Sequence, residues 1–236
     1  MRRITSLIRR AVEEYDMINE GEKVVVGVSG GKDSLVLLRC MKDLSRYYPK
    51  PFTVCGISLD MGFGADFDPI KRMCDELDIE YIIKKTNIKE IVFDIREEKN
   101  PCSLCAKMRR AALNDAAIEA GSRKIALGHH NDDVLETFFL SLMYEGRINC
   151  FSPVTHLDRM DVYQIRPMIY VREKDVRAAA RRNEIPVVES MCPANGVTKR
   201  QYMKELICRL EKENFPGIRK RLFTAIQNSE IDGWKL

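Results

Sequence analysis

The stretch KVVVGVSGGKDSLVLLRCMKDL, residues 23–44, decides the fold of this chain. It opens with an apolar run, which is typical of a strand buried on both faces of a parallel sheet. The turn SGGKDS follows at 29–34, and the apolar residues behind it recur at helical spacing. Strand, glycine-rich turn and helix in this order predict a phosphate site, because the turn amides and the helix N-terminus attract anions.

The residue types in the turn fit that prediction. Gly30 and Gly31 allow backbone conformations and close approaches that a side chain would block. Lys32 adds a positive charge, and Ser29 and Ser34 add hydroxyl donors. A Walker A loop is excluded, because it requires a glycine three residues before the turn, where this chain has valine. A plain strand-to-helix turn is the alternative.

Strands and helices alternate along the rest of the chain. This alternation predicts an α/β fold with a doubly wound parallel sheet and a small helical region at the C-terminal end. Further strands are expected at 52–60, 81–86, 124–129 and 186–190, with an extended segment at 162–170. Helices are expected at 3–15, 66–77, 106–120, 131–146 and 171–183.

The chain divides into three parts by character. Residues 1–20 form an amphipathic N-terminal helix, and 21–165 form a nucleotide-binding core that carries a cysteine insertion. Residues 166–236 complete the core and add basic helices.

Composition bounds the class of protein. The 236 residues are 45% hydrophobic and 31% charged, which suits a globular chain whose core is large enough to fold without disulfides or structural metals. No apolar stretch approaches about 18 residues and no signal-peptide pattern is present, so we expect a cytoplasmic protein without a membrane segment. In a reducing compartment the eight cysteines are better explained as thiols, metal ligands or catalytic groups than as disulfides. The net charge of +4 does not by itself predict a nucleic-acid partner.

Cysteine spacing suggests a metal site. Cys102 and Cys105 have the C-x-x-C spacing that lets two thiolates reach one metal ion, and a helix is expected directly after them. The alternatives are a redox pair or two ordinary buried cysteines. Because the chain has no second C-x-x-C, a four-cysteine zinc site is unsupported. Three thiolates, with Cys192 as the third, would leave one metal position open for chemistry.

The motif GHHNDD, residues 128–133, follows a predicted strand, and ligands bind at this end of the strands in open α/β sheets. Gly128 would let the chain pass close to a nucleotide. Asp132 and the aspartate after it could hold Mg²⁺ or cap the following helix. The two histidines are as consistent with a structural role as with a catalytic one. Ser58, at the end of the second predicted strand, is a nucleotide contact by position only.

Basic residues gather late in the chain. Lys174, Arg177 and Arg181 share one face of a predicted helix, and Lys199 and Arg200 follow. These charges would bind nucleic-acid phosphates, or they are an ordinary solvated face.

Together the motifs resemble a known family. SGGKDS, CSLCAKMRR, GHHNDDVLETFFLSLMYEG and CPANGVTKRQ resemble the PP-loop ATPases, and within them the branch that synthesises 2-thiocytidine in tRNA. The resemblance runs from about residue 22 to 212. Related 2-thiouridine enzymes carry the same three cysteines but also terminal zinc fingers. This chain has no cysteine before Cys40 and none after Cys208, which favours the thiocytidine branch.

The resemblance implies a reaction. ATP would adenylate the C2 oxygen of a tRNA cytidine, and sulfur would then replace that oxygen with release of AMP. Asp33 would help to place Mg²⁺. Cys102, Cys105 and Cys192 resemble the three ligands of a [4Fe-4S] cluster that presents sulfide, although a cysteine persulfide route stays open. The catalytic residues would be Asp33, Cys102, Cys105 and Cys192. The ATP-binding residues would be Ser29, Gly30, Gly31, Lys32, Asp33, Ser34, Ser58, Gly128 and Asp132.

The implied partners are tRNA and a sulfur donor, either a cysteine desulfurase or sulfide. A homodimer is one way to complete the tRNA surface, because the chain is shorter than many relatives. Asn195 stands where the family often has a further cysteine, which puts the substrate in doubt. Two other functions stay open: the same chemistry on another base or a small molecule, and a non-catalytic sensor of ATP or metal.

Overall fold

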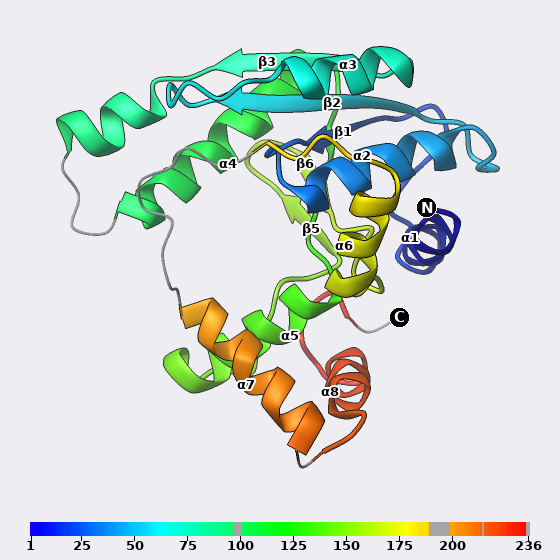
Figure 1. Cartoon of the computed structure of the whole chain (residues 1–236), viewed down its shortest axis with the longest axis vertical. Coiled ribbons are helices and arrows are strands. Elements are labelled where there is room, and N and C mark those ends of the chain that lie inside the picture. Colours follow the sequence, from blue (N-terminus) through cyan, green and yellow to red (C-terminus); the bar gives the residue numbers. More distant parts are fainter. Residues whose placement is uncertain (97–100, 189–198, 214, 235–236) are drawn as a thin grey trace.

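The computed structural model describes residues 1–96, 101–188, 199–213 and 215–234. Within these ranges the strands are β1 (Lys23–Gly27), β2 (Thr53–Asp60), β3 (Glu80–Lys85), β4 (Lys124–Ala126), β5 (Val154–Leu157) and β6 (Val162–Ile165). They form one sheet in the order β3-β2-β1-β4-β6-β5 (Figure 1). Neighbouring strands are parallel except β5, which runs antiparallel to β6.

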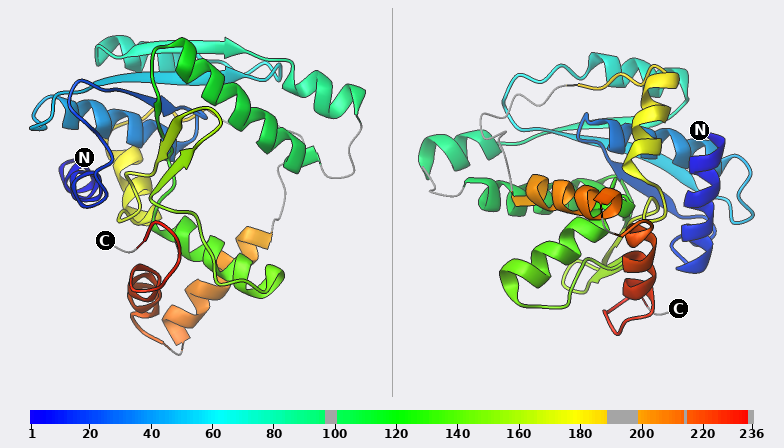
Figure 2. Two further views of the ribbon diagram at one scale, coloured as in Figure 1. Left: turned by 180° about the vertical axis from the view of Figure 1, so that it is seen from behind. Right: turned by 60° about the horizontal axis from the view of Figure 1, so that its bottom comes forward.

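Helices cover both faces of this sheet. Helix α4 (Pro101–Glu119) lies on one face, and α2 (Lys32–Ser45) and α3 (Asp68–Glu76) lie on the other (Figures 1 and 2). The predicted doubly wound α/β fold is therefore confirmed. No helix in the described ranges is long and apolar enough to cross a bilayer. The remaining helices are α1 (Arg2–Glu14), α5 (Asn131–Leu140), α6 (Glu173–Arg182), α7 (Lys199–Glu213) and α8 (Ile218–Gln227), with π-helical turns η1 (Glu90–Ile95) and η2 (Ser141–Glu145).

The fold explains why the three central residues of strand β1 are all apolar. Successive side chains of a strand point to opposite faces of the sheet. Val24 and Val26 belong to the larger core, which includes α1 and α2. Val25 belongs to the core on the other face, with Ala117 of α4 and Ile125 of β4. All three valines are fully buried, so a polar residue at any of them would lose burial worth about 1.5–3 kcal/mol.

The N-terminal helix packs on its own domain. Ile4, Ile8, Ala11 and Val12 form its apolar stripe and are buried in the larger core. Their spacing of three and four residues is the pattern that predicts this helix from sequence. The prediction of a helix at 3–15 is therefore confirmed to within one residue at each end.

The predicted strand 186–190 is wrong for the part that the structure describes. Residues 186–188 have no strand conformation, and 189–190 lie outside the described ranges. Pro186 has no amide hydrogen to give to a strand partner. The Val188 amide instead donates a hydrogen bond to the Gly30 carbonyl at 3.0 Å. This segment therefore covers the glycine-rich turn and does not extend the sheet.

Two further elements differ from expectation. Helix α4 begins at Pro101 rather than at 106, because proline suits the first turn of a helix, where no amide hydrogen bond is required. Strand β5 was not predicted. It pairs antiparallel with β6 as the edge strand of the sheet. The ring of His156 stacks there on that of Tyr163, with 4.2 Å between the ring centres.

The C-terminal helices pack against α5, and the chain after α8 packs against the end of the N-terminal helix. Helices α7 and α8 lie beside α5 below the sheet in Figure 1. Trp234 is fully buried, and its indole nitrogen donates to the Phe151 carbonyl at 3.0 Å. Its ring packs edge-on against Tyr15 and Phe223. The two ends of the described chain thus share one apolar core.

A buried ion pair joins α8 to the first turn of α5. Asp132 Oδ1 accepts from Arg219 Nη1 at 2.7 Å, and both side chains are only 8% exposed. Asp132 Oδ2 accepts from the Glu173 amide at 2.7 Å and from Arg172 Nε at 3.3 Å. One carboxylate therefore ties α5, α6 and α8 together.

Replacing Arg219 with Met should destabilise the protein strongly. The substitution removes one partner of a buried pair and leaves a poorly compensated charge, which costs about 3 kcal/mol. Urea denaturation would measure the free energy of unfolding. Lys220→Met, an exposed neighbour, should stay within about 0.5 kcal/mol of the parent. Equal losses in both variants would show that the pair adds nothing.

Candidate functional site

The glycine-rich turn is held closed by its own serines. The Ser34 hydroxyl accepts from the Ser29 amide at 3.1 Å and donates to the Gly31 carbonyl at 2.9 Å. Gly30 has a φ of +83°, a conformation that side chains disfavour. Helix α2 begins at Lys32, within the SGGKDS motif, so its first amides and the positive end of its dipole point to this loop. The arrangement fits an anion.

Gly128 packs against the backbone of the same loop. A Cβ at this position would come within 3.1 Å of the Ser34 nitrogen and 3.2 Å of the Asp33 carbonyl carbon. Glycine is therefore required so that the chain leaving β4 can lie against the start of α2. The predicted approach of Gly128 to a nucleotide stays a prediction, and the neighbour that the structure shows is the loop itself.

Asp33 carries an oxygen that the protein leaves unsatisfied. Its Oδ1 is buried and has no hydrogen-bond partner among the described residues. His130 Nε2 lies 3.7 Å away, and Asp33 Oδ2 accepts from Lys32 Nζ at 3.0 Å. A buried carboxylate oxygen without a partner is costly, and a bound cation would relieve that cost. These residues therefore fit Mg²⁺.

The structure corrects two predictions about the site. The N-cap of α5 is His130, whose Nδ1 accepts from the Asp133 amide, and not Asp132. Both Asp132 oxygens face arginines or an amide, and a carboxylate paired with two guanidinium groups is a poor ligand for Mg²⁺. Ser58 is fully buried and links the Val28 carbonyl to the Tyr81 hydroxyl, so its side chain holds strands together and does not face a ligand.

Two charged residues next to the loop, Glu173 and Lys204, were not predicted from the sequence. Glu173 Oε1 accepts from Lys32 Nζ at 3.2 Å and from Arg177 Nη2 at 3.0 Å. Its Oε2 pairs with Lys204 Nζ of α7 at 2.5 Å. Burial alone would raise the pKa of Glu173, but the hydrogen bond from Lys204 and the charge of Lys32 lower it to about 2. From the sequence, only the basic residues of α6 were predicted to bind a ligand.

A second charged group lies on α5. Arg200 Nη1 is 3.4 Å from Glu136 Oε2 and 3.5 Å from Asp133 Oδ1. Burial, together with the negative charge of Asp133, raises the pKa of Glu136 to about 7. His129 is different: burial lowers its pKa to about 4, and its ring packs 5.0 Å from that of Phe151. His129 therefore has a structural place.

The cysteine pair lies at the exposed start of α4. Cys102 is exposed and Cys105 is partly exposed, one helical turn further on. Two accessible thiols on one side of a helix start fit two ligands of a metal cluster, because C-x-x-C spacing lets both sulfurs reach one metal site. Cys192, the third predicted ligand, lies outside the described residues.

The other described cysteines are mostly buried in the core. Burial raises the pKa of Cys40, Cys55 and Cys150 to about 11 and that of Cys74 to about 12. Cys208 is the exception: it is exposed, and Arg219 Nη2 donates to its sulfur at 2.9 Å.

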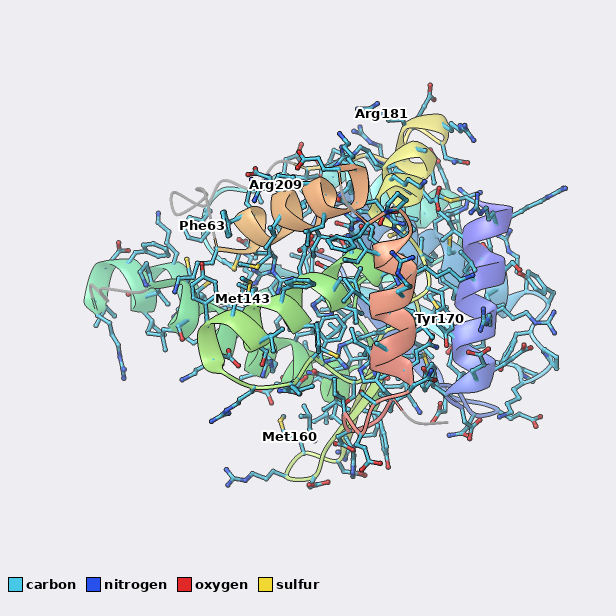
Figure 3. All side chains as sticks on the ribbon, turned by 90° about the horizontal axis from the view of Figure 1, so that it is seen from below. Phe63, Met143, Met160, Tyr170, Arg181 and Arg209 are labelled. Carbon is cyan, nitrogen blue, oxygen red and sulfur yellow. The ribbon has the colours of Figure 1, made fainter. Side chains whose placement is uncertain are left out.

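The basic residues predicted to bind RNA lie on the surface. Lys174, Arg177 and Arg181 are exposed on α6, and Figure 3 shows Arg181 at the outer end of that helix. Lys199 and Arg200 are exposed at the start of α7, where Lys199 Nζ lies 4.2 Å from the centre of the Tyr144 ring. Their exposure agrees with either a phosphate contact or a solvated face, so RNA binding stays a prediction.

Comparison with known proteins finds similarity across most of the chain. A family model described as a PP-loop domain matches residues 2–210. The tRNA-cytidine(32) 2-sulfurtransferase of Citrifermentans bemidjiense is 36% identical over 96% of this chain and 90% of that protein. The enzyme of that name from Aliivibrio fischeri is 37% identical over 92% of this chain and 72% of its own length.

A solved structure is also similar. The U34-tRNA thiolase NcsA from Methanococcus maripaludis with its [4Fe-4S] cluster superposes with a TM-score of 0.75 at 25% identity. The match covers 98% of this chain and 82% of that one.

Replacing Gly128 with Ala should weaken ATP binding by about tenfold, which corresponds to about 1.4 kcal/mol. The added methyl group would press on backbone atoms of the loop, which cannot move without reshaping the anion site. Isothermal titration with MgATP would measure the change. In the control Gly27→Ala, the crowding atom is the end of the Leu113 side chain, which can turn away. An affinity for ATP as high in Gly128→Ala as in the control would contradict this role.

Glu136→Gln should stabilise the protein at high pH but not at low pH. Because the folded-state pKa is raised to about 7, wild-type Glu136 contributes its full stability below about pH 4.5 and loses it as the pH rises through 7. Neutral glutamine has no such loss, so the melting temperature should exceed that of the wild type by roughly 7–14 °C at pH 8 and match it near pH 4. Exposed Glu213→Gln is the control. A difference that does not change with pH would show that Glu136 is ionised throughout.

Proposed function

Since this chain belongs to the PP-loop domain family, and within it to the tRNA-cytidine 2-sulfurtransferases, we propose that it adenylates the C2 oxygen of a tRNA cytidine and replaces that oxygen with sulfur. The C2 oxygen attacks the α-phosphorus of ATP, and pyrophosphate leaves. A sulfur nucleophile then attacks C2, and AMP leaves with the oxygen. Without ATP this oxygen would be a very poor leaving group.

The glycine-rich turn has the features that the first step needs. Its backbone is fixed by Ser34, and the amides at the start of α2 face the position of a bound anion. Lys32 adds a positive charge beside the phosphates. Asp33 has a buried oxygen that a magnesium ion would satisfy, and the ion would offset the charge of the leaving pyrophosphate.

The start of α4 has features that suit the second step. Cys102 and Cys105 are accessible at a helix N-terminus, and Cys192 would complete a set of three thiolates. A [4Fe-4S] cluster bound there would supply an iron without a cysteine ligand, able to hold the incoming sulfur. The similarity to the U34-tRNA thiolase NcsA, which has such a cluster, supports this assignment.

The observation that carries the proposal is the shared position of these two parts. The turn follows β1 at its carboxyl end. Helix α4 crosses from β3 to the parallel strand β4, so its N-terminus lies at the same edge of the sheet (Figure 1). An activated nucleotide at the loop and sulfur at the cysteines would therefore meet at one edge. We propose that the exposed Lys174, Arg177 and Arg181 help to hold tRNA there.

The test is thiolation of tRNA by protein purified without oxygen. Iron and acid-labile sulfide are measured first, and the protein is then incubated with unmodified tRNA, MgATP and sulfide. Nucleoside mass spectrometry should find 2-thiocytidine, with one AMP for each thiolated base. Asp33→Ala should lower AMP formation by roughly 100-fold or more while keeping its iron.

Cys102→Ser should lose iron and thiolation but still bind ATP. Cys208→Ser removes an exposed thiol away from the proposed ligands and should keep both. Thiolation by Cys102→Ser would refute the cluster assignment, and AMP formation without any thiolated cytidine would refute the substrate.

A further inference from the structure

One carboxylate holds two lysines that are far apart in the sequence. Glu173 Oε1 lies 3.2 Å from Lys32 Nζ in the glycine-rich turn, and Glu173 Oε2 lies 2.5 Å from Lys204 Nζ of α7. The chain thus brings a second ammonium group to the loop from the C-terminal helices. The Glu173 amide is itself fixed by its hydrogen bond to Asp132, so the carboxylate has a defined position.

Both lysines remain accessible. The side chain of Glu173 is 12% exposed, whereas those of Lys32 and Lys204 are 27% and 32% exposed. The two lysine side chains are therefore more than twice as exposed as the glutamate side chain that they share. A polyphosphate could approach the exposed lysines without displacing Glu173.

The local charge favours such an anion. Three cations surround Glu173, namely Lys32, Lys204 and Arg177, and one carboxylate neutralises only one of them. Asp33 also pairs with Lys32, whereas Lys204 pairs with Glu173 alone among the carboxylates of the described residues. An ammonium group in this setting makes strong, charge-assisted hydrogen bonds with phosphate oxygens.

We propose that Lys204 is a further phosphate-binding residue of the nucleotide site, and that Glu173 holds it beside the loop before ATP binds. This inference rests on the proposed binding of ATP at the loop. It gives α7 a direct part in the site in addition to its packing on α5. If Lys204 served packing alone, it would only link α6 to α7. The two roles differ in how a substitution changes the affinity for ligands with and without phosphates.

The experiment measures the binding of MgATP, inorganic pyrophosphate and adenosine to the full chain by isothermal titration. Lys204→Met keeps the length of the side chain and removes its charge. It should weaken ATP and pyrophosphate by about 10- to 100-fold, as expected for loss of one charge-assisted contact. Its affinity for adenosine should not change. Lys204→Arg restores the charge and should bind ATP within about threefold of the wild type, because guanidinium also pairs with phosphate.

Lys212→Met is the matched control, because Lys212 is exposed on the same helix. It should bind all three ligands as the wild type does. Equal losses for ATP and adenosine in Lys204→Met would overturn the inference in favour of packing. So would unchanged ATP affinity, or an arginine variant as weak as the methionine variant. A wild-type protein that binds no ATP would overturn the proposed function as well, whereas the other outcomes overturn the role of Lys204 alone.

Discussion

The arrangement of the site depends on the buried carboxylate of Asp132. It joins three chain segments, because it pairs with Arg219 of α8 and Arg172 and accepts the amide at the start of α6. Removing an ion from water is expensive, so such a carboxylate is stable only when its partners surround it. The same carboxylate fixes Glu173, because the amide that it accepts at the start of α6 is that of Glu173 itself. The geometry of the lysines at the loop is therefore a consequence of how Asp132 is neutralised.

Sequence alone predicted the elements whose pattern is local. The three central residues of strand β1 are all valines because both faces of the strand are covered, and the glycines and serines of the turn are typical of an anion site. Asp132 and Ser58 were assigned wrongly for a physical reason. A carboxylate next to a strand end looks the same whether it meets a metal ion or an arginine, and here the arginine is Arg219, far away in the chain. A hydroxyl at a strand end likewise does not reveal that Tyr81 will cover it.

Long-range pairing also explains why some residues of the site could not be predicted from the sequence. Nothing near Glu173 in the sequence marks it as the partner of Lys32 and Lys204, since both contacts exist only after α2, α6 and α7 have packed. The segment 186–188 has the apolar composition of a strand, but its proline and its bond to Gly30 suit a cover over the loop. Composition favours a conformation, and the available hydrogen-bond partners decide between conformations of similar energy.

The parallel sheet explains why one edge can serve two kinds of chemistry. Each crossover between parallel strands returns its helix against the strand direction, so the N-termini of α2 and α4 both face the carboxyl edge. Each N-terminus carries a partial positive charge. At α2 that charge favours phosphate, and at α4 it would favour the negative charge of a metal centre held by Cys102 and Cys105. Phosphate and thiolates would repel each other if they shared one helix start. Two separate helices let the fold stabilise both anions while keeping them at the same edge of the sheet.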